Sequence, residues 1–299
     1  MSTVAIDETN FGALEWALFA VVVTLWGSSF FLIAIGIEHL HPTVVAAGRI
    51  GGGAVALALF KKARRPLPRE AWTLTIVLGL VWMAVPFMLF TFAQQWIDSS
   101  MAGMLNASAP LFTALIAAII ARRLPSRRSR LGLLVGFAGV VLMTSPAFGS
   151  ARATALGIAM IVVAAGCYGV AFNLSVPLQR RYGTLPVLLR AELAALLAVT
   201  PFALAGLNNS TFAWSSVIAV AILGALGTGI AFVAFVNLAG RVGATRASLN
   251  TYLMPVMAVL LGVLFLGETL TPIVMTGAAL TIAGAYLATR ANTSRVPKP

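Results

Sequence analysis

Charged side chains are scarce in this sequence. Only 9% of the 299 residues are Asp, Glu, Lys or Arg, whereas 60% are hydrophobic. A soluble domain carries about 25% charged residues. A globule of this size could not hide so much apolar surface from water, so the solvent around it must be lipid. Apolar runs of about 20 residues, each long enough to cross a hydrocarbon core of ~30 Å, recur along the chain. The composition predicts an all-α polytopic membrane protein.

Cysteine and histidine are also rare. The single cysteine, Cys167, excludes an intramolecular disulfide and a thiolate metal cluster. The two histidines, His39 and His41, share one short loop, so we expect neither a metal site nor a catalytic triad. The sequence has no phosphate-binding glycine loop followed by Lys and Ser or Thr, which excludes an ATPase, and we expect no cofactor. Residues 1–13 contain two acidic residues and no Lys or Arg, unlike the basic start of a signal peptide.

The apolar runs predict ten transmembrane helices joined by short loops. Their expected ranges are 14–37, 42–60, 71–95, 100–121, 129–146, 154–178, 185–206, 212–239, 244–266 and 271–289. Of the 20 Lys and Arg residues, 17 fall after even-numbered helices, and one, Arg152, falls in an odd-numbered loop. By the positive-inside rule, residues 1–13 and the tail 290–299 are both expected in the cytoplasm. We therefore attribute the net charge of +12 to topology and expect no nucleic-acid partner.

The sequence repeats itself at an offset of 145 residues. The aligned pairs include Pro110 with Pro255, Gly132 with Gly277, Phe87 with Phe232, and Phe90 with Phe235. This predicts two five-helix units, 14–146 and 154–289. Because five is odd, the second unit enters the membrane from the side opposite to the first. Inverted repeats of this kind are typical of secondary transporters that bind their substrate near the midplane.

Pro110 and Pro255 fall near the centres of the fourth and ninth expected helices. A proline in the middle of a helix removes one backbone hydrogen bond and kinks the helix. In hydrocarbon, the freed carbonyl must face a cavity or a polar neighbour. We expect the two prolines to act as hinges beside a central cavity. The alternative is that they are ordinary, packed prolines of membrane helices.

Ten helices, two inverted units and the motif "LWGSSF" (25–30) resemble the EamA-type branch of the drug/metabolite transporter superfamily. The resemblance covers essentially the whole chain. Within the branch, the chain is similar to bacterial exporters of aromatic and other neutral amino acids. This implies a secondary transporter of the bacterial inner membrane that works by alternating access, takes a small-molecule substrate, and is a monomer or a weak homodimer. The alternatives are an exporter of hydrophobic or cationic drugs or other metabolites, a channel, and a membrane enzyme, for which no nucleophile–base pair is found.

Three charged residues within the expected spans are candidates for function. Arg49 lies near the middle of the second helix. We expect it either to bind a substrate carboxylate or act as a gate, or else to have a structural partner or to snorkel toward the interface. Glu192 in the seventh helix is the acid that could couple transport to protons, with snorkelling at the rim as the alternative. Glu15 opens the first helix. It either binds a cation, as the small multidrug exporters of the superfamily do in their first helix, or complements the helix dipole.

Neutral polar and aromatic side chains complete the expected binding site. They are Trp26, Ser28, Trp82, Gln94, Asn106, Tyr168, Asn173, Asn237, Asn250 and Tyr252. Amides, hydroxyls and freed backbone carbonyls could hold a zwitterion while aromatic rings enclose its side chain. The alternative is that the asparagines join helix to helix and that the tryptophans lie at the membrane interface.

Overall fold

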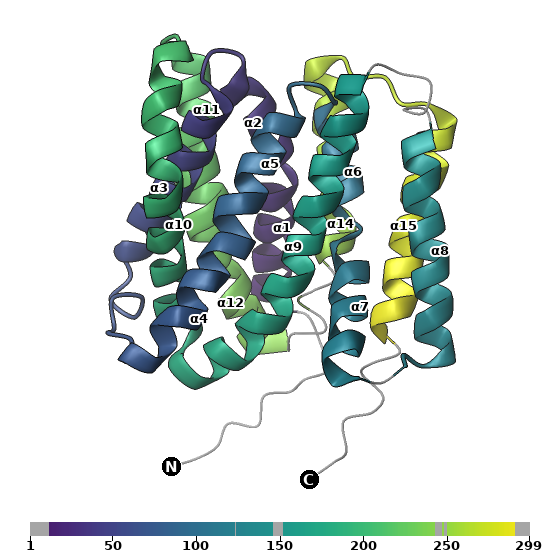
Figure 1. Ribbon diagram of the computed structural model, residues 1–299, viewed down its shortest axis with the longest axis horizontal. Coiled ribbons are helices and arrows are strands. Elements are labelled where there is room, and N and C mark those ends of the chain that lie inside the picture. Colours follow the sequence, from purple (N-terminus) through teal and green to yellow (C-terminus); the bar gives the residue numbers. More distant parts are fainter. Residues whose placement is uncertain (1–11, 123, 146–151, 243–246, 248–249, 291–299) are drawn as a thin grey trace.

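The computed structural model describes residues 12–122, 124–145, 152–242, 247 and 250–290. Every regular element in these ranges is helical (Figure 1). The α-helices are α1 (Ala13–Gly27), α2 (Ser29–Ile37), α3 (Pro42–Ala58), α4 (Arg69–Gly79), α5 (Val85–Ala93), α6 (Ser99–Asn106), α7 (Ala109–Ala121), α8 (Arg127–Thr144), α9 (Arg152–Tyr182), α10 (Thr184–Gly206), α11 (Trp214–Gly224), α12 (Ala231–Val242), α14 (Asn250–Leu266) and α15 (Pro272–Arg290). Two π-helical segments, η1 (Leu80–Ala84) and η4 (Ala225–Ile230), and one short 3-10 segment, η3 (Leu207–Asn209), join some of them.

Apolar side chains cover the outer surface as well as the interior. Large residues such as Leu197 (76% exposed), Leu134 (71%) and Phe265 (68%) stand on the outside, where lipid can cover them. Within the described ranges, six helical stretches are long and apolar enough to cross a membrane: Ala13–Ile37, Arg69–Ala93, Ser99–Ala121, Thr154–Tyr182, Thr184–Asn209 and Trp214–Val242. Three shorter apolar helices accompany them: Pro42–Ala58, Asn250–Leu266 and Pro272–Ala288. The chain is therefore an all-helical, multi-pass membrane protein.

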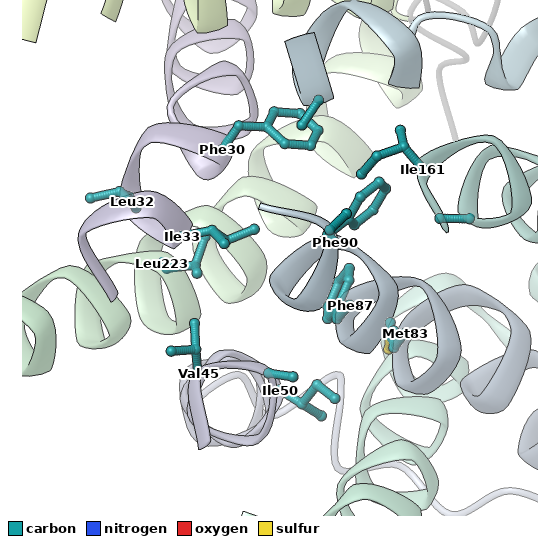
Figure 2. Packing of buried hydrophobic residues seen from close by; sticks show 14 of the residues in the cluster. Phe30, Leu32, Ile33, Val45, Ile50, Met83, Phe87, Phe90, Ile161 and Leu223 are labelled. Atoms are coloured by element: carbon teal, nitrogen blue, oxygen red, sulfur yellow. The ribbon is translucent and has the colours of Figure 1, made fainter. Parts of the chain in front are cut away.

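The main buried cluster lies where α2, α3, α5, α9 and α11 meet. Figure 2 shows Phe87 and Phe90 of α5 next to Met83 of η1, with Phe30 of α2 and Ile161 of α9 close to Phe90. Each of these side chains is at most 4% exposed. The aromatic rings of α5 thus form a face toward the middle of the molecule, and Arg49 of α3 lies against Phe87 on this face.

Two of the expected membrane helices are interrupted near their middle. The first breaks at Ser28, between α1 and α2, and the fourth breaks before Ala109, between α6 and α7. Pro110 lies in the first turn of α7. Backbone N–H groups in a first turn have no partner within the helix, so the N–H that proline lacks costs no helical hydrogen bond there. At each break a serine hydroxyl bonds the carbonyl three residues back: Ser28 to Leu25 at 3.2 Å and Ser108 to Leu105 at 2.7 Å. These bonds supply the carbonyls at the breaks with hydrogen-bond donors, which lipid tails do not have.

Pro255 behaves differently from Pro110. It lies inside α14, which continues from Asn250 to Leu266 without interruption. The two prolines align in the sequence, yet only the one in the first half coincides with a helix break. The two π-helical segments do follow the repeat, because η1 begins at Leu80 and η4 at Ala225, 145 residues apart.

The helices α8 and α15 form an antiparallel pair beside the rest of the molecule (Figure 1). Their glycines let the two backbones touch. A Cβ built on Gly139 would lie 2.6 Å from the carbonyl oxygen of Gly277, and one built on Gly132 would lie 2.7 Å from that of Gly284. Gly277 and Gly284 are the 145-residue counterparts of Gly132 and Gly139, so each glycine packs against the counterpart of the other. The glycines of α8 thus join two helices of one chain.

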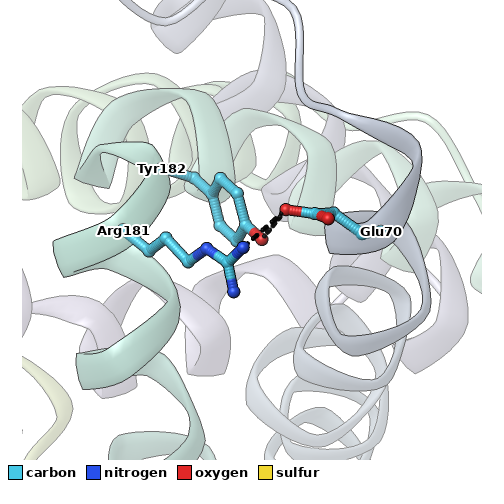
Figure 3. A network of polar contacts seen from close by, with 3 residues as sticks. All are labelled: Glu70, Arg181 and Tyr182. Carbon is cyan, nitrogen blue, oxygen red and sulfur yellow. Dashed lines mark hydrogen bonds and ion pairs between the residues drawn. The ribbon is translucent and has the colours of Figure 1, made fainter.

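Polar contacts at the surface tie together the ends of helices. Glu70 at the start of α4 accepts hydrogen bonds from Arg181 at 2.8 Å and from the Tyr182 hydroxyl at 2.7 Å, both at the end of α9 (Figure 3). Glu15 at the start of α1 accepts one from Arg241 at the end of α12, at 3.1 Å. The Glu70–Arg181 pair is well exposed, so it fixes the relative position of helix ends more than it adds stability.

Candidate functional site

Arg49 is a charged residue buried in the middle of the molecule. It lies on α3, which begins at Pro42. The side chain of His41 caps the first turn of this helix by accepting a hydrogen bond from the backbone N–H of Thr43. The Arg49 residue is only 7% exposed. Its Nε donates a hydrogen bond of 3.2 Å to Oγ1 of Thr228 in η4, and its guanidinium carbon lies 3.7 Å from the centre of the Phe87 ring. The hydroxyl and the ring face offset part of the cost of removing the charge from water.

The outer part of the Arg49 guanidinium is free. Neither terminal nitrogen donates a hydrogen bond to any described residue, and neither is fully sealed from solvent. A guanidinium with its Nε engaged and both terminal nitrogens free presents a fork that matches a carboxylate. The geometry of Arg49 is therefore suited to an anionic group, and its role in substrate binding stays a prediction.

Glu192 on α10 is the second buried ionisable residue. Its exposure is 0%, and neither carboxyl oxygen has a hydrogen-bond partner among the described residues. No nitrogen of Arg49 lies within 4.0 Å of either oxygen, although the charges of the two residues act on each other. Gly53 of α3 lies beside the carboxyl group: a Cβ there would be 3.0 Å from Oε1 of Glu192 and 2.8 Å from Cγ2 of Thr228. Glu192 is therefore in the interior near Arg49, and not at the rim of the molecule.

Aromatic rings from both halves of the chain form a continuous series next to these charges. In order of contact the rings are Phe235, Trp26, Phe232, Trp82, Phe172, Tyr168, Phe90 and Phe30, with neighbouring centroids between 5.2 and 5.9 Å apart. We call these eight rings the aromatic series. Edge-to-face and tilted geometries dominate it, as expected for stable ring packing. Three of the expected site residues, Trp26, Trp82 and Tyr168, belong to it.

Three amide side chains from the expected site are buried with unsatisfied atoms. Gln94 at the end of α5 has no partner for either its amide nitrogen or its oxygen. Asn106 at the end of α6 has no partner for Oδ1, and Asn250 at the start of α14 has none for Nδ2. Each is at most 8% exposed. Because unpaired buried polar atoms are costly, these three amides are ready to bond a polar ligand or water.

Other expected site residues have local partners. Asn173 donates to the carbonyls of Thr113 and Gly169 at 3.0 and 2.9 Å, so it joins α9 to α7. Asn237 is exposed and donates to the carbonyl of Val233 in its own helix. Tyr252 packs against Tyr286 of α15, with ring centroids 5.9 Å apart.

Thr228, Phe87, Phe172 and Phe232 were missing from the expected site. A sequence signal existed for two of them, since Phe87 and Phe232 align at the 145-residue offset. Thr228 had no such signal, because threonine is common in membrane helices and its role depends on η4 turning it toward Arg49. Phe172 contacts Trp82 because α9 packs on η1, which could not be foreseen from either residue alone.

A multi-pass helical protein with isolated charges in an aromatic interior is typical of proteins that move small molecules across membranes. The comparison with protein families agrees: the model of the EamA-like transporter family matches residues 14–145 and 155–290. The chain therefore belongs to the EamA-like transporter family, whose members are transporters and not enzymes. The resemblance noted in the sequence is confirmed.

Individual relatives extend this result. The chain is 31% identical to the uncharacterized inner membrane transporter YedA of Escherichia coli (strain K12), over 86% of this chain and 84% of YedA. It is 29% identical to a probable terminal-alkyne amino-acid exporter of Streptantibioticus cattleyicolor, over 94% of each. It is 23% identical to a probable amino-acid metabolite efflux pump of Salmonella typhimurium, over 89% of this chain and 92% of the pump. One solved structure shares the fold with a TM-score of 0.62 and 21% identity, covering 94% of this chain and 99% of that one.

Proposed function

We propose that the protein exports neutral amino acids, aromatic ones included, by alternating access. The observation that carries this proposal is the buried Arg49, whose two terminal nitrogens have no partner among the described residues. A substrate carboxylate would supply the two missing acceptors in a site from which water is largely excluded. Two relatives named as exporters of amino acids or their metabolites support the substrate class.

The aromatic series supports the inclusion of aromatic substrates. Phe87 lies under the Arg49 guanidinium, and Phe90 of the same helix belongs to the series. An amino acid whose carboxylate binds Arg49 would therefore have its side chain against ring faces and edges. The unsatisfied amides of Gln94, Asn106 and Asn250 would provide further polar contacts.

The proposed layout has ten membrane crossings in two inverted halves, 14–146 and 154–289. Two observations support this layout. The starts of η1 and η4 are separated by the same 145 residues as the sequence repeat, and the glycines of α8 and α15 contact each other reciprocally. In this layout, alternating access exchanges the open side by moving α1–α7 against α9–α14, with α8 and α15 as a fixed support. The helix break before Pro110 would act as a hinge, and we propose a hinge at Pro255 as well.

The protein is proposed to lie in the bacterial inner membrane with both ends of the chain in the cytoplasm. The relative YedA is named as an inner membrane transporter, and the distribution of Lys and Arg gives the orientation. We propose a monomer, or a weak homodimer, as the transporting unit. Tags at Ser2 and Pro299 should be accessible to reagents from the cytoplasm alone, and labelling of either tag from the outside would contradict the ten-crossing layout.

The test of function is flux through purified protein in proteoliposomes. Labelled phenylalanine, threonine, lysine and a lipophilic cation are compared in parallel vesicles. We expect phenylalanine and threonine to move, and Arg49→Ala to abolish their movement while leaving the amount of folded protein unchanged. Arg49→Lys, which keeps the charge but loses the fork, should recover only part of the flux. Loss of folded protein in both variants would instead make Arg49 structural.

An exporter of hydrophobic or cationic drugs is the second candidate. The aromatic series would accept a flat hydrophobic molecule whether or not it carries a carboxylate. Glu15, the candidate cation ligand, accepts a hydrogen bond from Arg241 and is not free. Movement of the lipophilic cation alone, with flux insensitive to Arg49→Ala, would establish this alternative.

A further inference from the structure

Arg49 and Glu192 occupy nearly equivalent places in the two halves of the chain. Arg49 comes seven residues after Pro42 in α3, and Glu192 comes six residues after Pro186 in α10. The helices α3 and α10 pack against each other over much of their length. A basic and an acidic side chain thus face the same part of the interior from paired helices.

The two side chains are close but form no direct ion pair. No nitrogen of Arg49 lies within 4.0 Å of the Glu192 oxygens, and neither of these oxygens has any hydrogen-bond partner. Buried ions of opposite sign normally form a direct pair, because an unpaired charge in a low-dielectric interior is very costly. The unmet needs are complementary: both terminal nitrogens of Arg49 and both oxygens of the Glu192 carboxyl group lack a partner among the described residues.

From this geometry we propose that Arg49 and Glu192 bind the two ends of an α-amino acid zwitterion, and that the substrate ammonium displaces a proton from Glu192. This inference rests on the proposed function. In the empty protein the Glu192 carboxyl group has no donor and holds a proton. When the ammonium group binds, the carboxyl group becomes a carboxylate, an ionic hydrogen bond forms, and the proton passes to the water on the side that is open. The same residue then exchanges one amino acid for one proton.

The groups around Glu192 support a proton as the exchanged ion. One charged residue of the facing elements, Arg49, acts on Glu192, and Gly53 of α3 lies beside its Oε1. Arg190, two residues earlier on α10, turns away and donates to the carbonyls of Ala63 and Arg64. On α9, Tyr168 acts on Arg49, and Cys167 is its neighbour in sequence. The charges of α9 and α4 lie near the ends of these helices: Arg180 and Arg181 in the last turn of α9, and Arg69 and Glu70 in the first turn of α4. No cluster of three or more acidic, His or Cys ligands exists among the described residues, so a metal cation lacks a coordination shell there.

The exchange also requires the helices to move. Both oxygens of Glu192 are sealed from solvent in this conformation, and Gly53 lies beside one of them. The ammonium group can reach them only when α3, α10 and η4 separate slightly. Proton release is thereby tied to the conformational step that alternating access needs, and leakage of protons through the closed form is prevented.

The experiment follows protons and substrate together in proteoliposomes of wild-type protein with a pH-sensitive dye inside. We expect one proton to move against each phenylalanine, and the apparent Kd of phenylalanine to rise about tenfold for each pH unit toward acid. The analogue 3-phenylpropanoate lacks the ammonium group, so its binding should release no proton. Proton release by this analogue equal to that by phenylalanine would overturn the proposal even if no variant folds.

Variants then assign the proton to Glu192. Glu192→Gln should abolish coupled proton movement and weaken phenylalanine binding, but leave binding of 3-phenylpropanoate unchanged. Glu38→Gln is the matched control, because Glu38 is exposed at the end of α2. Phenylalanine flux without proton movement in wild-type protein would refute this inference and leave the proposed function intact. Absence of any amino-acid flux would refute the proposed function itself.

Discussion

The carboxylate of Glu268 accepts two hydrogen bonds from Ser99, one from its backbone N–H at 2.8 Å and one from its hydroxyl at 2.7 Å. A third comes from the backbone N–H of Ser100 at 2.9 Å. Ser99 begins α6, whose first N–H groups have no partner within the helix, and Glu268 follows the end of α14. A residue from the second half of the chain thus caps a helix of the first half. In the proposed layout this contact holds the external side closed.

Removal of the Glu268 carboxylate should loosen this contact. Glu268→Ala leaves three donors unsatisfied at a helix N-terminus, with an expected loss of roughly 1–3 kcal/mol of stability. Thermal unfolding in detergent and hydrogen exchange of the α6 amides measure the effect. The exposed Glu38→Ala serves as the control and should change neither. Slow, unaltered exchange at Ser99 and Ser100 in Glu268→Ala would contradict the role of the contact.

Asp98 should make this contact sensitive to pH. Partial burial and the neighbouring Glu268 carboxylate raise the pKa of Asp98 above its usual value. Because the folded-state pKa is the higher one, ionised Asp98 lowers stability at neutral pH, and this penalty disappears as the pH falls through the folded-state pKa. Asp98→Asn should therefore raise the melting temperature slightly at pH 7 and have no effect near about pH 3. A gain that is equal at both pH values would show that charge is not the cause.

The pairing of α8 with α15 should depend on its glycines. A Cβ on Gly284 would lie 2.2 Å from the backbone nitrogen of Gly136, and a backbone atom cannot rotate away. Gly284→Ala should destabilise the protein by roughly 1–3 kcal/mol through overpacking. Gly240 is the matched control, since a Cβ there has nothing within 4 Å. Gly240→Ala should be neutral or slightly stabilising, and equal melting temperatures for the two variants would refute the packing argument.

Thr228 should position Arg49 for the substrate. Its hydroxyl accepts the bond from Nε of Arg49 and also donates to the carbonyl of Leu223 at 3.1 Å. Thr228→Val keeps the shape but removes the acceptor, so the guanidinium loses its fixed orientation. We expect KM for phenylalanine to rise roughly tenfold, the equivalent of about 1.4 kcal/mol, with little change in kcat. Thr228→Ser should restore the wild-type KM, and failure to do so would assign the defect to packing of the lost methyl group.

The two aligned prolines should differ in their effect on turnover. Pro110→Ala offers α7 a donor that could join it to α6 across the break, which would stiffen a proposed hinge. Pro255→Ala only completes a helix that is already continuous. We expect Pro110→Ala to slow transport severalfold without weakening substrate binding, and Pro255→Ala to have a smaller effect. Flux and binding measured on both variants decide this, and unchanged flux in Pro110→Ala would remove the hinge.

Several parts of the site could be predicted from the sequence. A charge such as Arg49 in the middle of an apolar run is too costly to face lipid, so its burial follows from composition. The aromatic residues Trp26, Trp82 and Tyr168 could be proposed because they lie at membrane depth, and they do belong to one series of rings. The family resemblance followed from the repeat and one motif, and it holds over both halves of the chain.

Other parts could not be predicted, because they depend on how each helix is rotated. Asn237 and Asn173 have the same side chain and were expected at the same site, but one is exposed and the other joins α9 to α7. The interior and the lipid-facing surface are both apolar, so the periodic pattern that orients a soluble helix is missing. The break before Pro110 and the continuity through Pro255 likewise depend on neighbours that the two aligned segments do not share.

By itself, the sequence determined that lipid surrounds this protein, that it is helical, that its sequence is repeated, and to which family it belongs. The length of the apolar runs and the spacing of the repeat are properties of the chain alone. Tertiary structure decided which polar groups meet. Arg49 and Thr228 are 179 residues apart in sequence and share a hydrogen bond, while Glu192 lies near both with no bond at all. These relationships arise where α3, α10 and η4 pack, since close packing fixes the rotation of each helix and so the direction of every side chain.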